Sequence, residues 1–255
     1  MNKIIIEPSK LEHILRVGLL SDGKSLLEQV PVTFKENGLS IKDRSYSSVV
    51  TVAAFKTSYF KEYDVKEEQV VVLTKTLFDK LKLFKNEEEL TVSISEDKFK
   101  LQSQNISYEE DLLEDTGQDF GIEMEKVDFG VIPKKVNTDG YPIQFDIDST
   151  HLATLPDSEQ FCIYTEEQYG DSILIEIEDR GKTNMFLSVE QFQKFEVFEQ
   201  SFTGKVFSKL ASNLTGTINV IVDDTGIIIN QKHPDYVLMY GQASQAEKRT
   251  VEVTN

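Results

Sequence analysis

The sequence predicts an α+β protein of two similar domains, each built from two βαβββ units. Three observations favour this fold class. Short runs rich in β-branched residues recur along most of the 255-residue chain, four segments with helical spacing interrupt them, and an acidic stretch with several glycines and prolines lies near the middle. We expect antiparallel sheets on one side of each domain and helices lining the other face.

The strands are expected to be short and antiparallel. The run Leu90-Thr91-Val92-Ser93-Ile94 alternates apolar and polar residues, which is typical of a strand with one face in water. Turn signals such as Glu36-Asn37-Gly38 separate such runs. The expected strands cover residues 30–34, 39–41, 48–52, 70–73, 90–94, 99–102 and 106–108, then 143–147, 161–164, 173–177, 185–189, 195–198, 218–222, 227–229 and 236–239.

Four helices are expected from apolar residues that recur every three or four positions. Pro8 marks the start of the first helix, and Thr74 and Ser149 are the expected N-caps of the second and third. The four helices cover residues 9–20, 74–84, 149–155 and 203–214. Each half of the chain then holds two copies of one unit, a strand, a short helix and several antiparallel strands, which match in pattern and not in residue identity.

An acidic connector is expected between the two domains. Residues 107–128 contain nine acidic side chains and one basic side chain, Lys126, and glycines and prolines punctuate this stretch and its continuation. We therefore expect an N-terminal domain over residues 1–114, a connecting loop over 115–141 and a C-terminal domain over 142–255.

The positive charges are concentrated in a few segments, although the chain as a whole is strongly acidic. The chain has a net charge of −17 and a pI near 4.6, which taken whole argues against nucleic acid as a partner. Residues 9–16, 74–85 and 203–214, which contain the first, second and fourth helical segments, in contrast carry a net +6, which leaves −23 for the remainder; the third helical segment has His151 and no lysine. Lysine is a good helix former, but three basic helices at corresponding places indicate a positive face that would attract a phosphate backbone.

No pattern of residues in the sequence indicates a catalytic site. No phosphate-binding glycine loop occurs, His13, His151 and His233 lack metal-ligand spacing, and Cys162 is expected on a buried strand. We expect no cofactor and no metal. The chain also lacks a signal peptide or an apolar run of membrane-spanning length, so we expect a cytoplasmic protein. An acidic β-rich enzyme such as a carbohydrate hydrolase stays open as an alternative, because chance pairs among 44 carboxylates could mimic its site.

Several segments, taken in order, resemble the PCNA-type DNA sliding clamps of archaea and eukaryotes. They are Gly38-Leu39-Ser40-Ile41, the segment 60–65, the basic helix Leu77-Phe78-Asp79-Lys80-Leu81-Lys82 with its following hairpin, and Phe129-Gly130-Val131-Ile132-Pro133 at the end of the connector. The chain departs from the family in two places, because Arg44-Ser45-Tyr46 replaces its usual Met-Asp and residues 236–243 replace its usual Leu-Ala-Pro ending. The resemblance covers nearly the whole chain and indicates a divergent archaeal or viral member.

The resemblance implies a trimeric ring with the helices around a central hole. Such a ring would hold double-stranded DNA without reading its sequence, and it would tether a DNA polymerase, a clamp loader and other replication and repair proteins. The basic residues expected to face DNA are Lys10, Arg16, Lys75, Lys80, Lys82, Lys85, Lys205 and Lys209.

The resemblance also implies two protein-binding surfaces. Partners would insert a short hydrophobic and aromatic motif into a pocket under the connector, which we expect to contain Ser48, Val49, Phe129, Val131, Ile132, Pro133, Met239 and Tyr240. Subunits would pair edge to edge through Ile106, Tyr108 and Leu112 of one chain and Met185 and Leu187 of the next. A clamp-fold scaffold that never closes a ring is a further alternative.

Overall fold

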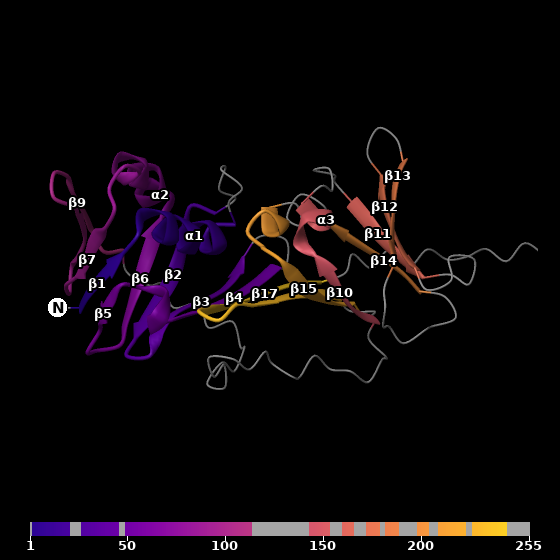
Figure 1. The fold of residues 1–255 in the computed structure, drawn as a ribbon, viewed down its shortest axis with the longest axis horizontal. Helices are drawn as coiled ribbons and strands as arrows, with labels where there is room; N and C mark the ends of the chain where they lie inside the picture. The colour runs from indigo at the N-terminus through magenta and orange to yellow at the C-terminus, as the bar shows by residue number, and fades with distance from the viewer. Residues whose placement is uncertain are drawn as a thin grey trace, which may run out of the picture.

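The structure is a computed structural model of the 255-residue chain (Figure 1). It describes residues 2–20, 27–45, 49–113, 143–153, 160–165, 172–178, 182–188, 198–203, 209–222 and 226–243. Within these residues, no helix is long and apolar enough to cross a membrane.

Strands predominate in both halves, as the sequence predicts. The first half contains β1 (Asn2–Ile6), α1 (Pro8–Gly18), β2 (Gln29–Lys35), β3 (Gly38–Ser45), β4 (Val49–Lys56), η1 (Thr57–Tyr59), β5 (Glu62–Asp64), β6 (Gln69–Thr74), α2 (Lys75–Leu81), η2 (Lys82–Phe84), β7 (Leu90–Ile94), β8 (Lys98–Gln102) and β9 (Ser107–Asp111). The second half contains β10 (Ile143–Asp148), α3 (Ser149–Ala153), β11 (Gln160–Thr165), β12 (Ser172–Glu178), β13 (Lys182–Ser188), β14 (Phe198–Thr203), β15 (Thr217–Val222), β16 (Gly226–Lys232) and β17 (Tyr236–Ala243).

The order of the elements confirms the repeated βαβββ unit, which begins at β1, β6, β10 and β14. Paired units exchange their first strands: β1 joins β7, β8 and β9, and β6 joins β2, β3 and β4. The second half repeats this exchange, with β10 beside β15 and β14 beside β11. Within each half, both sheets therefore contain strands of two units.

An eight-stranded sheet runs through both halves in the order β10-β15-β16-β17-β4-β3-β2-β6. Its central contact is the antiparallel pair β4–β17, in which Tyr236 lies opposite Phe55 and Gln242 lies opposite Val49. Two smaller sheets, β5-β1-β7-β8-β9 and β13-β12-β11-β14, complete the architecture. α1, α2 and α3 lie on the same side of the eight-stranded sheet (Figure 1).

This sheet has two distinct sides, because successive residues of a strand point to opposite faces. We call the helix side the one that carries Phe55 and Tyr236, whose rings lie 5.8 and 5.1 Å from the ring of His13 on α1. The outer side carries the alternate residues, such as Val52 and Met239, which are paired with each other. Most of the buried aromatic and aliphatic core lies on the helix side, between the sheet and the helices.

The helices begin and end for local reasons. α1 starts with Pro8, whose fixed backbone angle suits the first helical turn, and it buries Leu11, Ile14 and Leu15. α2 starts after Thr74, whose side-chain oxygen accepts a hydrogen bond from the Leu77 backbone N–H at 3.0 Å. The predicted cap of the second helix is therefore confirmed.

The structure differs from the sequence prediction in several elements. Two strands were not predicted, β1 and β5. Asp148 precedes α3, and its side chain accepts hydrogen bonds from the Thr150 backbone N–H at 2.9 Å and from the Thr150 hydroxyl, so this carboxylate caps the helix in place of Ser149. The prediction of a helix from Thr203 was wrong at its start, because Thr203 ends strand β14, and in the described residues this helix covers positions 209–211.

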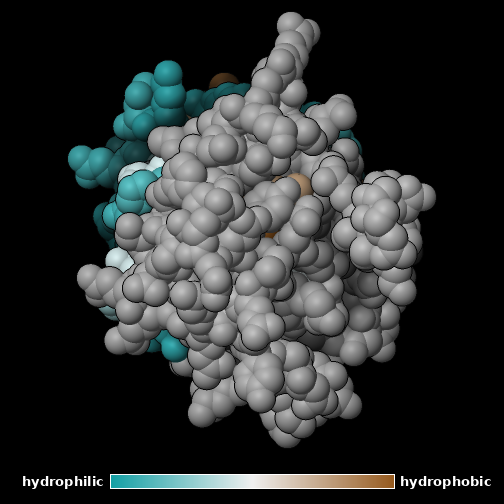
Figure 2. Space-filling model, turned by 90° about the vertical axis from the view of Figure 1, so that its right-hand side faces the viewer, coloured by the Kyte–Doolittle hydropathy of each residue, from teal (hydrophilic) through white to brown (hydrophobic). Residues whose placement is uncertain are grey.

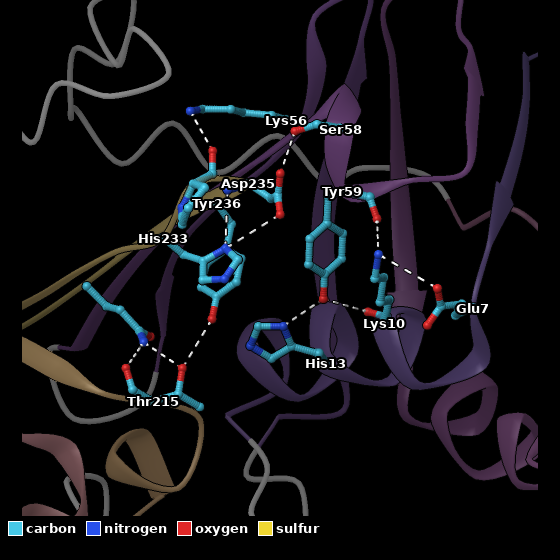
Figure 3. A network of polar contacts seen from close by, with 12 residues as sticks. Glu7, Lys10, His13, Lys56, Ser58, Tyr59, Thr215, His233, Asp235 and Tyr236 are labelled. Carbon is cyan, nitrogen blue, oxygen red and sulfur yellow. Dashed lines mark hydrogen bonds and ion pairs between the residues drawn. The ribbon is translucent and has the colours of Figure 1, made fainter.

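A network of polar and aromatic residues joins the two halves beside the β4–β17 pair (Figure 3). The Ser58 hydroxyl donates to Asp235 at 2.7 Å, and Lys56 Nζ donates to the Pro234 carbonyl at 2.7 Å. The ring of Tyr236 packs against His13, Phe55 and Tyr59 from the other half of the chain. These contacts and the shared sheet hold the halves together.

Candidate nucleic-acid interface and partner surface

The α2 segment presents a basic surface on the helix side. Leu77, Phe78, Leu81 and Phe84 are buried, so the intervening positions of the segment point away from the core. We call the four lysines of this segment the α2 patch: Lys75 is half-buried, and Lys80, Lys82 and Lys85 are exposed.

Two lysines of the α2 patch form exposed ion pairs. Lys82 Nζ lies 2.8 Å from Asp79 Oδ1, and Lys75 Nζ lies 3.4 Å from Glu28 Oε1. The pKa of Asp79 is lowered, first by the hydrogen bond from Lys82 and then by the charges of Lys82, Lys75 and Lys80. These lysines therefore favour the ionised form of the Asp79 carboxyl group.

The basic residues of α1 are both engaged within the protein. Lys10 Nζ donates to the Tyr59 carbonyl at 3.1 Å, and the Arg16 guanidinium donates to Glu12 Oε1 at 2.9 Å from Nε and 2.7 Å from Nη2. Both residues are half-buried. Their charges are consequently less available to an external phosphate than those of the α2 patch.

Among the described residues of the second half, the basic residue predicted to face DNA is largely buried. Lys209 is only 9 % exposed, which leaves little of it to contact DNA. α3 has no lysine, and its His151 is exposed. Lys205 lies outside the described residues.

The outer side of the central sheet carries an apolar surface near the junction of the halves. Val52 pairs with Met239, Ala54 pairs with Val237, and Ile228 lies opposite Gly241 on the neighbouring strand. We call these residues, together with Val50, the outer strip. Val52 and Ala54 are each 4 % exposed, whereas Val50, Ile228, Val237 and Met239 are half-buried. The half-buried members of the strip are partly accessible and can pack against an apolar partner group.

The predicted partner pocket is only partly placed on this surface. Met239 belongs to the outer strip. The prediction that Val49 and Tyr240 contribute to this pocket was wrong, because both lie on the helix side of the sheet, where they are 0 % and 1 % exposed. Val50 and Val52, one and three residues further along β4, occupy the outer side instead. The remaining pocket residues, Ser48, Phe129, Val131, Ile132 and Pro133, lie outside the described residues.

The predicted subunit contacts lie on or next to strands at the ends of their sheets: Tyr108 is on β9, Met185 and Leu187 are on β13, and Ile106 and Leu112 flank β9. β9 ends the five-stranded sheet and β13 ends the four-stranded sheet. Ile106, Tyr108 and Leu112 pack partly against the core of their own domain. Met185 and Leu187 lie on β13 opposite Ile175 and Ile173, and their side chains are outside the described set.

Few of the large hydrophobic residues that the structure describes are exposed. Viewed from the end that carries β12 and β13, the coloured residues are mainly hydrophilic, with only small hydrophobic areas (Figure 2). In the described ranges, the exposed large hydrophobic residues are Val70, Leu83 and Leu113. The same residues contain no group of three or more His, Cys, Asp or Glu side chains that could hold a metal ion.

Comparison with known proteins finds solved structures with a similar fold but no match by sequence. No protein-family model matches the chain, and no curated protein matches it by sequence. PCNA of Archaeoglobus fulgidus, solved with the C-terminal region of FEN-1 bound, is 14 % identical with a TM-score of 0.71, and the match covers 97 % of this chain and 99 % of that one.

Two further PCNA structures agree. PCNA of Entamoeba histolytica is 15 % identical with a TM-score of 0.72, over 96 % of this chain and 99 % of that one. PCNA of Thermococcus kodakaraensis is 10 % identical with a TM-score of 0.68, over 96 % of this chain and the whole of that one. The predicted α+β fold with two similar halves is confirmed, and the chain has the fold of PCNA along nearly its entire length.

Proposed function

We propose that this chain is a subunit of a DNA sliding clamp, a non-enzymatic processivity factor that encircles duplex DNA and tethers replication and repair enzymes to it. The observation that carries the proposal is the full-length likeness to PCNA, which spans both halves and not a single common domain. A carbohydrate hydrolase would need a built catalytic cleft, and nothing in the fold likeness favours one.

The charge distribution supports a DNA-facing helix side. The α2 patch is positive although the whole chain carries −17. Lysines that meet phosphates alone give binding without sequence preference, because base edges are not contacted. A ring that surrounds the duplex could therefore remain linked to it while sliding.

The positions of β9 and β13 support head-to-tail assembly. These two strands lie at opposite ends of the molecule along its long axis (Figure 1), and each ends its sheet. Pairing of β9 of one copy with β13 of the next would satisfy both open edges. Since the two surfaces differ, repeated pairing produces a closed ring when the rotation between copies is one third of a turn. We propose such a trimer.

The outer strip supports a site for clamp-binding proteins. In A. fulgidus PCNA the bound partner is the C-terminal region of FEN-1. We propose that the outer strip of this chain receives a short apolar and aromatic segment of a DNA polymerase, a clamp loader or a repair enzyme. The site of action is then wherever the cell replicates its DNA, which is the cytoplasmic nucleoid in an archaeon.

A topological experiment tests the proposal. A linear duplex is fixed to beads at one end, incubated with the protein at low salt, and then blocked at its free end with streptavidin. A ring threaded on the duplex stays bound through a high-salt wash and is released when a restriction enzyme cuts the DNA, because salt weakens phosphate contacts but not a topological link.

One control defines the outcome of this experiment. Omitting the streptavidin block should let the threaded protein slide off during the wash. A protein that washes off equally with and without the block does not encircle DNA, and this result contradicts the clamp proposal.

A further inference from the structure

We infer that this clamp subunit grips duplex DNA mainly through α2, with Lys80 and Lys85 as its principal phosphate contacts, while the basic residues of α1 hold the fold together. This inference rests on the proposed function and divides the predicted DNA-facing residues into two groups. A ring of three copies would then carry three separate basic strips around its hole in place of a continuous basic lining.

Lys10 is held between α1 and η1 (Figure 3). Its amine donates to the Tyr59 carbonyl at 3.1 Å, lies 3.9 Å from the Glu7 carboxylate and lies 5.2 Å from the centre of the Tyr59 ring. A phosphate would have to displace these contacts, so Lys10 serves chiefly to fasten the first turn of α1.

Arg16 is held at the other end of α1. Its guanidinium pairs with Glu12, which cancels its charge locally, and it lies 5.9 Å from the centre of the Phe78 ring of α2. The backbone carbonyl of Arg16 accepts a hydrogen bond from the buried Asn213 side chain at 3.3 Å. Arg16 therefore lies where α1 meets α2 and the second half of the chain.

Lys80 and Lys85 differ from both. Each is exposed, and neither forms an ion pair within the part of the chain that the structure describes. Lys80 is exposed in the last turn of α2, next to the buried Leu81 and one turn after the buried Leu77. Its ammonium group, like that of Lys85, can release counterions when it meets a phosphate, because no ion pair among the described residues has to be broken first.

The other two lysines of the α2 patch can assist. The pairs Lys75–Glu28 and Lys82–Asp79 are exposed, with side-chain exposures of 41 % and 80 % for the first and 68 % and 53 % for the second. Exposed pairs of this kind contribute little free energy. An approaching phosphate can consequently replace either carboxylate at low cost.

The test measures how DNA binding depends on salt. A short fluorescent duplex is titrated with the intact protein at several salt concentrations, and anisotropy gives the slope of log K against log salt. We expect the double substitution K80E/K85E to reduce this slope by about 1 for each phosphate that the protein no longer neutralises. Light scattering of the same samples should show unchanged assembly.

Three further variants make the test specific. K3E/K232E changes the net charge equally at two exposed lysines outside the helices, and it should leave the slope nearly unchanged. K10Q/R16Q should lower the thermal unfolding temperature while keeping the slope. K205E should alter the slope less than K80E/K85E.

The possible results test the inference about α2 and the proposed clamp function separately. An equal reduction of the slope in K3E/K232E, K10Q/R16Q or K205E overturns the assignment to α2 but leaves the clamp proposal standing. A wild-type protein that neither binds the duplex nor assembles contradicts the proposed function itself.

Discussion

Replacing Gly18 by alanine tests how α1 packs on the central sheet. Gly18 is the last residue of α1 and is buried. A Cβ atom there would lie 2.8 Å from Val30 Cγ1, 3.2 Å from Val30 Cγ2 and 3.4 Å from Ile41 Cδ1. Val30 and Ile41 are both 0 % exposed, so neither side chain can move away without disturbing the core.

The expected magnitude follows from two opposing effects. Overpacking a core by one methyl group costs about 1–3 kcal/mol, whereas alanine is up to about 1 kcal/mol better than glycine in a helix. Because the added Cβ atom would come within 2.8 Å of a buried side chain, the upper part of the first range, about 2–3 kcal/mol, applies. Subtracting about 1 kcal/mol for the better helix former, we expect G18A to lower the unfolding free energy by about 1–2 kcal/mol. For a chain of this size the midpoint of thermal unfolding should fall by about 2–8 °C.

Gly241 offers a matched control for this experiment. A Cβ atom at Gly241 would meet Ile228 Cγ1 and Val50 Cβ at 4.0 Å, which is ordinary contact. Differential scanning calorimetry of G18A, G241A and wild type should show a lower midpoint for G18A alone. A midpoint of G18A equal to or above that of wild type would refute the proposed packing of α1 against Val30 and Ile41.

Three other predictions concern the N-cap of α2, His13 at the contact between the two halves, and Tyr240 on the helix side of β17. T74A should cost about 1 kcal/mol of stability by removing the hydrogen bond to the Leu77 N–H, measured by urea unfolding against T76A, which alters an exposed helical position. Burial lowers the pKa of the His13 imidazole below 6.5 in the folded protein. The unfolded chain therefore binds a proton at His13 more readily than the folded protein does. The unfolding free energy should consequently fall as the pH drops below 6.5, by at most about 1.4 kcal/mol per pH unit. H13Q should flatten this dependence between pH 5.5 and 7.5, and an unchanged slope would exclude His13 as its source. Y240F should keep or raise stability, because the buried Tyr240 hydroxyl has no hydrogen-bond partner among the described residues; a clear loss of stability in calorimetry would count against that placement.

The sequence predicts most of the fold because local patterns determine its elements. Alternating residues such as those of 90–94 mark strands with one wet face, and the strand is observed there as Leu90–Ile94. Apolar spacing and Thr74 mark the start of α2. β1 was not predicted because Ile4, Ile5 and Ile6 are apolar on both faces and end at Pro8, so they show no alternation.

The candidate sites were harder to predict because they depend on contacts between distant segments. Residues 49–54 are almost entirely apolar, so the sequence of β4 itself cannot show which of its residues face the helices and which face outward. The ring contacts of Phe55 with His13 of α1 decide the matter. Likewise, the sequence shows the charge of Lys10 but not the Tyr59 carbonyl, 49 residues away, to which it donates.

The most direct measurement of the central claim is the mass and shape of the purified protein. Light scattering at micromolar concentration, combined with negative-stain imaging, should show particles of three 29.1-kDa chains arranged as a ring around a central hole. A stable single chain of 29.1 kDa without rings would contradict a self-assembling clamp.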